Sequence, residues 1–183
     1  MNDLLSPILF LMNGHEVDSF WCFVGFMDRV ERYFEKGQVF MQEQLTELGL
    51  ILREVDMALH EYLISTNSDN LFFCFRWLLC QFKREYTLND TMRIWEVCWS
   101  DYLTEKFTLF IALVTILKLR NKILHEQLAF HDILKQCNDL SGELDVDEIL
   151  IMAEFAYKHW NLTQKKNEKQ KQKQQQQREQ QQQ

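Results

Sequence analysis

The sequence predicts an all-α protein, arranged as a multi-helix bundle-like array. Apolar residues recur at the three- and four-residue spacing of a helix through most of the chain, and no segment alternates with period two over strand length. One proline and five glycines are the strongest breakers in 183 residues, and they fall mostly between periodic segments. Hydrophobic residues make up 46% of the chain, which is enough for a real core.

The apolar face of the first periodic segment begins almost at the first residue of the sequence. Asn2 and Asp3 are followed by a largely apolar stretch, 4–12, and then by a helix that is entered near Asp18 and ended by Gly37. The first residues include no lysine or arginine, and no small-x-small cleavage site follows them, so they do not form a convincing signal peptide.

The next segment, 38–63, is predicted to be one helix. Its apolar residues recur in steps of four and three, which is a heptad pattern and raises the possibility of a coiled-coil arm. Leu50, Ile51 and Met57 widen the apolar surface beyond two positions in seven. The pattern therefore favours a helix buried on more than one side.

Two helices are predicted next. Leu71–Tyr86 is strongly apolar and ends in basic residues, which suit a helix C-terminus. Thr87 with Asp90 three residues later resembles a capping box, with Asp in place of the usual Glu. It predicts the start of a helix that carries Trp95.

Three helices complete the predicted body. Phe107–Leu124 contains the longest apolar run, which is too short for the ~20 residues that a bilayer span needs. A short helix over 130–140 is stopped by Ser141 and Gly142. The last helix opens with acidic residues and is predicted to end near Lys158.

Charge divides the chain into a body, 1–163, and a tail, 164–183. The tail has six Lys/Arg and two Asp/Glu, a net +4, while the whole chain carries −7, so the body carries −11. The tail contains no apolar residue, which predicts a disordered Lys/Gln-rich low-complexity segment, although lysine and glutamine are good helix formers and the last helix can fray into it. An acidic body argues against a nucleic-acid partner.

The sequence contains no complete motif for catalysis or metal binding. His60-Glu61 and His125-Glu126 begin like H-E-x-x-H, but no histidine follows at the required position. No glycine-rich phosphate loop and no G-x-S-x-G occurs. The five cysteines form no C-x-x-C pair and are interpreted as buried free thiols of a reducing compartment. The sequence therefore predicts no metal, no cofactor and no catalytic residue of its own.

Aromatic strings with internal charges are predicted to form the core. A charge in an apolar helical face is usually paired, and Glu85 and Glu96 are candidate partners for the arginines. The predicted structural core comprises Trp21, Phe75, Arg76, Trp77, Arg93, Trp95, Glu96 and Trp99.

These strings are similar, in order and spacing, to the later part of a TBC domain, the Rab GTPase-activating module. Six strings over about residues 1–155 carry the resemblance: Asp3–Leu9, Phe20–Phe23, Phe75–Glu85, Arg93–Glu96, Phe130–Ser141 and Asp145–Leu150. The resemblance implies that the body, 1–163, is a partial TBC domain and forms its second lobe.

The resemblance also implies a mechanism with two fingers. In the family, M-x-D-L follows a Y-x-Q-G motif whose glutamine orients the attacking water, and an I-x-x-D-x-x-R motif further upstream supplies an arginine that stabilises the transferring phosphate. Neither motif occurs in these 183 residues. Met1 is thus expected to correspond to an internal methionine of a longer ancestor. Asn2 and Asp3 are expected to be remnants beside the Rab site that cannot replace a finger.

Three functions stay open at this point. The first is a Rab GTPase activator of vesicle trafficking whose fingers lie upstream. The second is a non-catalytic adaptor that binds a Rab or another protein through helical surfaces, and the third is a generic helical interaction protein outside the family. The expected partner is a Rab-family small GTPase, and the expected location is the cytoplasm, with peripheral association to endomembranes through the Rab.

Overall fold

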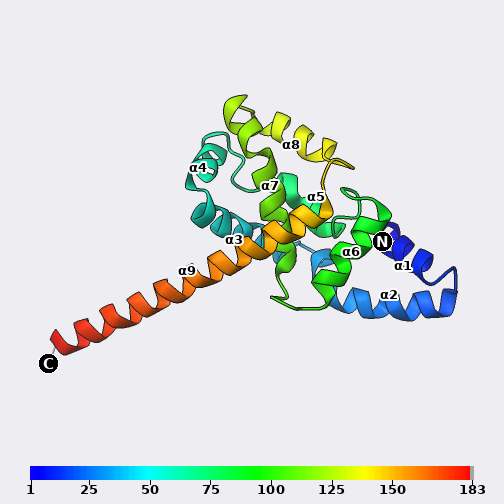
Figure 1. Cartoon of the computed structure of the whole chain (residues 1–183), viewed down its shortest axis with the longest axis horizontal. Coiled ribbons are helices and arrows are strands. Elements are labelled where there is room, and N and C mark those ends of the chain that lie inside the picture. Colours follow the sequence, from blue (N-terminus) through cyan, green and yellow to red (C-terminus); the bar gives the residue numbers. More distant parts are fainter. Residues whose placement is uncertain (182–183) are drawn as a thin grey trace.

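A long apolar helix, α7 (Phe107–His125), forms the centre of the molecule (Figure 1). The computed structural model describes the backbone of residues 1–181 and the side chains of residues 1–172 and 175. Residues 107–116 of α7 are all buried, and the helix packs against α9, α3, α5 and α4. This confirms the helix predicted from the apolar run. No strand occurs within residues 1–181.

The N-terminal region is a helical hairpin at one end of the molecule (Figure 1). Helix α1 (Asn2–Leu11) and helix α2 (Glu16–Val30) pack against each other, and a 3-10 helix, η1 (Glu31–Phe34), continues α2. Gly14 turns the chain between the two helices with a φ of 78°, a value that suits glycine.

The predicted single helix over 38–63 is wrong, because the chain breaks at Asp56 into α3 (Val39–Val55) and α4 (Met57–Ser65). The Asp56 carboxylate accepts a hydrogen bond from the backbone N–H of Leu59 at 3.0 Å and so caps α4. Its second oxygen pairs with Arg120 of α7. A tertiary ion pair therefore helps to place a break that the heptad pattern does not show.

The segment 71–86 is also shorter in helix than predicted. A 3-10 helix, η2 (Phe72–Cys74), leads into α5 (Phe75–Leu79), and an irregular turn follows over 80–87. Helix α6 (Leu88–Trp99) then begins as predicted, with Thr87 as its cap: the Thr87 hydroxyl accepts from the Asp90 N–H at 3.3 Å.

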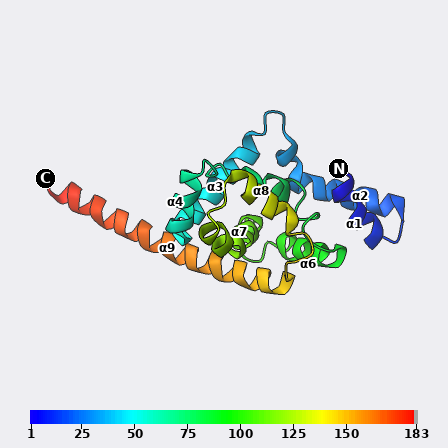
Figure 2. The same cartoon turned by 90° about the horizontal axis from the view of Figure 1, so that it is seen from above.

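The C-terminal helices are α8 (Phe130–Asp139) and α9 (Val146–Gln181). Asp145 caps α9, since its carboxylate accepts from the Glu148 N–H at 3.0 Å. Helix α9 crosses α7 and then runs out beyond the body (Figure 2).

The tail differs from the prediction. Helix α9 continues past Lys158 and includes residues 164–181, which were expected to be disordered; residues 182 and 183 lie outside the described part. Glutamine, lysine and glutamate are good helix formers, and no glycine or proline interrupts the segment. Within residues 1–181, no helix combines the length and the apolarity needed to cross a bilayer.

Candidate functional site

The first turn of α1 is tied to the turn over 80–87. The Arg84 guanidinium donates to both oxygens of Asp3, from Nε at 3.3 Å and from Nη2 at 3.0 Å. This hydrogen bonding from Arg84 lowers the pKa of the Asp3 carboxyl. Asn2 beside it is exposed. A carboxylate in the first turn also suits the positive end of a helix dipole.

The turn itself is held by packing and by one buried hydrogen bond. Gln81 and Phe82 adopt φ values of 48° and 60°, in the left-handed region that non-glycine residues seldom occupy. Phe82 is fully buried and stacks beside Trp77. The Trp95 indole donates from Nε1 to the Gln81 carbonyl at 2.7 Å. The turn is therefore fixed in a conformation that local preference alone would not select.

The loop between α8 and α9 joins the same turn. The Ser141 hydroxyl donates to the Arg84 carbonyl at 2.9 Å, and the Gly142 N–H donates to the Glu85 carbonyl at 3.1 Å. Gly142 has a φ of 80°, which favours glycine at this point. We name Asp3, Arg84, Glu85, Ser141 and Gly142 the anchor cluster, because they join three segments distant in sequence. The sequence indicated Ser141 and Gly142 only as a helix break.

Glu85 of the anchor cluster also forms an ion pair with Arg76, whose side chain is 31% exposed. Arg76 Nη2 lies 2.7 Å from Oε1 of Glu85, whose side chain has no exposed surface. Glu85 was predicted as a partner of the core arginines, and the structure confirms it for Arg76. Burial raises the pKa of the Glu85 carboxyl, and Arg76 opposes that shift. The second oxygen of Glu85 has no hydrogen-bond partner among the described residues.

The predicted core residues divide into two groups. Trp77 and Trp95 are buried, as predicted. The prediction that Trp21 belongs to the core is wrong, because 65% of its surface is exposed. Helix α2 is apolar on most sides, and the face it buries carries Phe26 and Val30 instead.

The remaining core predictions are also corrected. Arg93 and Glu96 form a pair at 3.1 Å, one turn apart on α6, and both side chains are more than half exposed. Phe75 is half-buried and Trp99 is exposed. The face of α6 that packs inward carries Ile94 and Trp95, so its charged pair stays in water. The prediction that all five cysteines are buried is correct only for Cys74 and Cys137, because Cys80 and Cys98 are half-buried and Cys22 is exposed.

An apolar groove of about 550 Å³ lies between α1, α2 and α6, beside the exposed end of the first helix. The side chains that line it are mostly apolar, and include Pro7, Leu11, Met12, Met92, Trp95 and Trp99. The groove can accommodate apolar side chains of another segment or protein.

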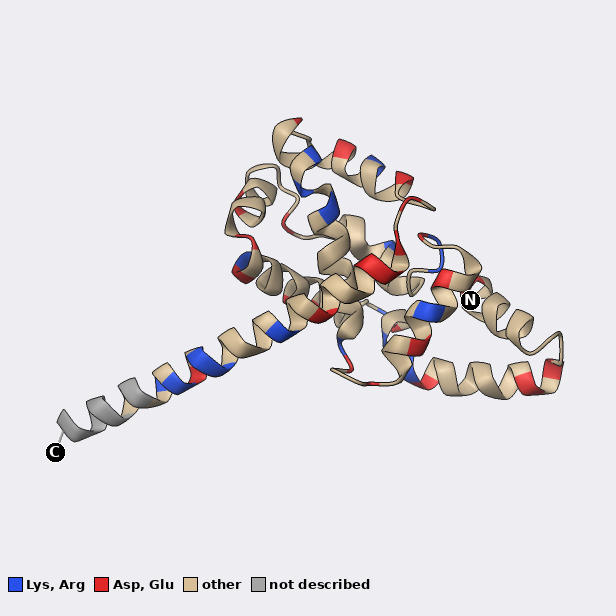
Figure 3. Ribbon diagram, in the orientation of Figure 1, with Lys and Arg blue, Asp and Glu red and all other residues tan. Residues whose placement is uncertain are grey.

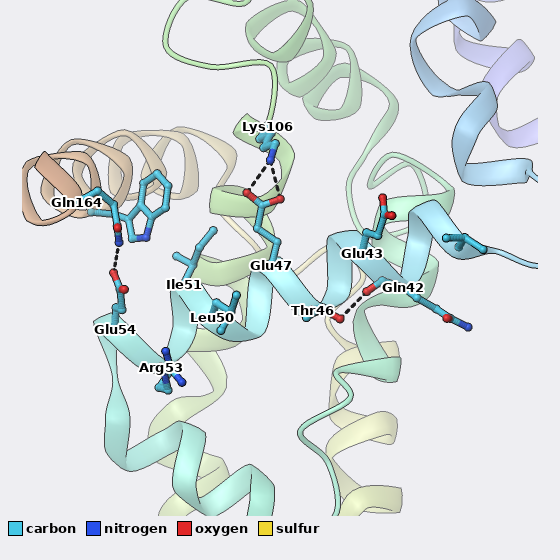
Figure 4. Close-up of a pocket in the computed structure, with 12 residues that line it drawn as sticks. Gln42, Glu43, Thr46, Glu47, Leu50, Ile51, Arg53, Glu54, Lys106 and Gln164 are labelled. Atoms are coloured by element: carbon cyan, nitrogen blue, oxygen red, sulfur yellow. Dashed lines mark hydrogen bonds and ion pairs between the residues drawn. The ribbon is translucent and has the colours of Figure 1, made fainter. Parts of the chain in front are cut away.

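A second groove, of about 670 Å³, lies between α3 and α9 (Figure 4). Lys106 reaches both oxygens of Glu47 at 2.7 Å, and the side-chain amide of Gln164 donates to Glu54. These carboxylates are therefore already engaged. Within the described part of the chain, no group of three or more His, Cys, Asp or Glu side chains is placed to hold a metal ion.

The family model for the Rab-GTPase-TBC domain matches residues 1–125, which include the groove between α1, α2 and α6. The chain belongs to this family. The TBC match ends at α7 and therefore includes Asp3, Arg76, Arg84 and Glu85 but not the α8–α9 loop that completes the anchor cluster.

Two relatives extend the TBC similarity beyond the matched domain. TBC1 domain family member 17 of Mus musculus is 42% identical over 158 residues, which are 86% of this chain and 24% of that protein. GTPase-activating protein GYP7 of Saccharomyces cerevisiae is also 42% identical over 158 residues, 86% of this chain and 21% of that protein. The chain thus spans less than a quarter of the length of these curated relatives.

The fold of this TBC chain is similar to the solved Ypt/Rab-GAP domain of Gyp1p, with a TM-score of 0.68 and 19% sequence identity. The similar region covers 80% of this chain and 45% of that chain. At this identity the likeness concerns the fold alone, and it agrees with the all-α architecture predicted from the sequence.

Proposed function

We propose that this chain forms part of a GTPase-activating module for Rab-family small GTPases. The observation that carries the proposal is the fixed position of the first turn of α1, which Arg84 holds through Asp3. By the family pattern, the residues before this turn bring a glutamine to the GTPase. Asn2 and Asp3 would then border the Rab site, and the anchor cluster would set where that site lies.

The chain supplies a scaffold in this proposal, and the two fingers come from another segment. Neither finger motif is found in the 183 residues. Arg29, Arg76 and Arg84 are each paired with a carboxylate, at 2.8 Å, 2.7 Å and 3.0 Å. An arginine finger must instead reach the transferring phosphate, where it accelerates hydrolysis by about 10³- to 10⁵-fold. We therefore expect no Rab GTPase activation by this chain alone.

A second candidate is a non-catalytic adaptor that binds a Rab or another protein. The apolar groove between α1, α2 and α6 favours it, because a groove of this kind accepts apolar side chains without any catalytic group. In both proposals the protein works in the cytoplasm on endomembranes, where the family's part in vesicle trafficking would bring it to a Rab.

The decisive test compares two proteins on a panel of GTP-loaded Rabs. One is this chain, and the other is this chain joined to the preceding TBC segment of mouse TBC1 domain family member 17, provided that segment carries both finger motifs. Single-turnover GTP hydrolysis should rise only with the joined protein, and replacing its finger arginine with alanine should abolish the rise. Comparable stimulation by the short chain would refute the scaffold proposal. Binding of GTP-loaded Rab without stimulation by either protein would favour the adaptor.

A further inference from the structure

The outward face of α9 carries a line of exposed apolar side chains. Ile151, Phe155 and Leu162 are 56%, 69% and 61% exposed. Separations of four and seven residues place them on one side of the helix. The other side packs on the body, where Ala153 is buried and Trp160 lies edge-on to a phenylalanine of α7. The apolar line is thus additional to the packing face.

Lysines continue the same line toward the end of the chain. Lys158 follows Phe155 by three positions, and Lys166 and Lys169 follow Leu162 by four and seven. All three lysines are exposed. Figure 3 shows basic residues gathered on the part of α9 that projects beyond the acidic body. We name Ile151, Phe155, Leu162 and these three lysines the α9 outer face.

The shape of the molecule leaves the α9 outer face accessible to a flat surface. Figure 2 shows α9 running along one edge, with the other helices on one side of it. Two carboxylates near this face are paired, Glu154 with Lys158 and Glu148 with Lys118, each at 2.5 Å, whereas Asp147, four positions before Ile151, is exposed. These pairs reduce the repulsion that free carboxylates would exert on an anionic surface.

We propose that the α9 outer face binds an anionic phospholipid surface. The helix lies parallel to the membrane, its apolar side chains enter the headgroup region, and Lys166 and Lys169 approach the phosphates. Exposed apolar residues joined to a lysine cluster are typical of helices that lie on membranes, and each lysine near an anionic leaflet strengthens binding. This contact requires no Rab and goes beyond the proposed function.

A second copy of the chain is the main competing occupant of this face. Parallel pairing would bring each lysine of the face close to its own copy, and like charges at such spacing repel. Antiparallel pairing would set Leu162 opposite Phe155 and avoid that repulsion. The positive charge of the lysines is therefore better matched by an anionic phospholipid surface than by a parallel copy. The experiment below detects antiparallel pairing.

The test is co-sedimentation of the full chain with Rab-free vesicles. One set contains phosphatidylcholine alone, and the other also contains phosphatidylserine. We expect binding to the second set only, weakened by added salt because surface charge is screened within about 10 Å at 0.1 M. Phe155→Ser with Leu162→Ser should reduce binding at least tenfold. Lys166→Gln and Lys169→Gln should each reduce it about fivefold.

Matched controls test whether vesicle binding depends on the α9 outer face or on charge and hydrophobicity in general. Lys171→Gln removes a lysine two positions from Lys169, on the other side of the helix, and should change binding less than twofold. Phe72→Ser removes an exposed phenylalanine outside α9 and should have no effect. Equal binding to both vesicle sets, or an equal loss with Lys171→Gln, would overturn the proposal. A dimer in sedimentation velocity that Phe155→Ser with Leu162→Ser dissolves, without vesicle binding, would assign the face to a second copy.

Discussion

Arg84 and Asp3 are 81 positions apart in sequence, yet their side chains meet at 3.0 Å and join the first turn of α1 to the turn before α6. Both side chains are partly exposed, at 53% and 35%. A pair in this setting contributes little stability, because water screens it. Its main consequence is positional: it fixes the start of α1 relative to the buried turn.

Replacing Asp3 with Asn should lower the free energy of unfolding by about 0.5 kcal/mol at pH 7. Because the native pKa of Asp3 is lowered, its contribution is present above the ordinary value of 3.8 and is lost as the pH falls through the native pKa. Urea unfolding should therefore show a larger difference between wild type and Asp3→Asn at pH 7 than at pH 3. Asp69→Asn, in an exposed turn, is the control and should match wild type at both.

Removing Arg76 should cost far more, because its partner is buried. Arg76→Met leaves the Glu85 carboxylate without its counter-ion, a change worth about 3 kcal/mol. The pKa of Glu85 is shifted in the opposite direction to that of Asp3. Burial raises the pKa of Glu85, so protonation at lower pH relieves the unpaired charge, and the loss should be smaller at pH 5 than at pH 7.

Two further variants test this explanation by the same urea unfolding. Arg76→Met combined with Glu85→Leu should recover much of the lost stability, since no buried charge remains. Arg93→Met breaks an exposed pair on α6 and should cost at most about 0.5 kcal/mol. An Arg76→Met loss that is independent of pH would contradict the role given to the Glu85 charge.

Two tryptophans from similar aromatic strings should respond differently to truncation. Trp77 is fully buried, so Trp77→Ala should lower the free energy of unfolding by about 3–5 kcal/mol. Trp21 is largely exposed, so Trp21→Ala should change it by less than about 0.5 kcal/mol. Equilibrium denaturation followed by circular dichroism measures both. Similar losses in the two variants would show that Trp21 is buried in solution.

These contrasts show how far the sequence alone could predict the structure. The class of fold, the helix at α7 and the Thr87 cap follow from local patterns, since an apolar run or a capping residue acts within a few positions. The exposure of Trp21 does not follow from such a pattern, because α2 is apolar on several sides and periodicity cannot select the face that packs. The break at Asp56 combines a local cap, in which Asp56 accepts from the Leu59 N–H, with an ion pair to Arg120 of α7 that no local pattern contains.

The candidate site was less predictable than the fold. Asp3 was expected beside a Rab site only through the family resemblance, and its partner Arg84 was interpreted as a core charge. The contacts of Ser141 and Gly142 with the 80–87 turn join segments more than 50 positions apart, so only the folded chain reveals them. Helical propensity explains why residues 164–181 are helical, although their lack of apolar side chains pointed to disorder.

The hairpin of α1 and α2 exposes an apolar surface that should promote association of the isolated chain. Phe10, Leu11, Val17, Phe20 and Trp21 are all exposed, at one end of the molecule (Figure 1). Contiguous apolar patches on soluble proteins usually mark interaction surfaces. This end also borders the groove that α1 and α2 form with α6. The exposed hairpin surface and the groove therefore form one continuous apolar region.

We therefore expect the chain alone to self-associate as its concentration rises, and the double variant Phe10→Ser with Trp21→Ser to shift it toward monomer. Sedimentation velocity over a range of concentrations measures this shift. Phe72→Ser is the matched control, because Phe72 is similarly exposed but lies outside the hairpin, and it should leave association unchanged. Joining the preceding TBC segment should suppress association if that segment covers the hairpin. A chain that stays monomeric at every concentration would show that this apolar surface does not drive self-association.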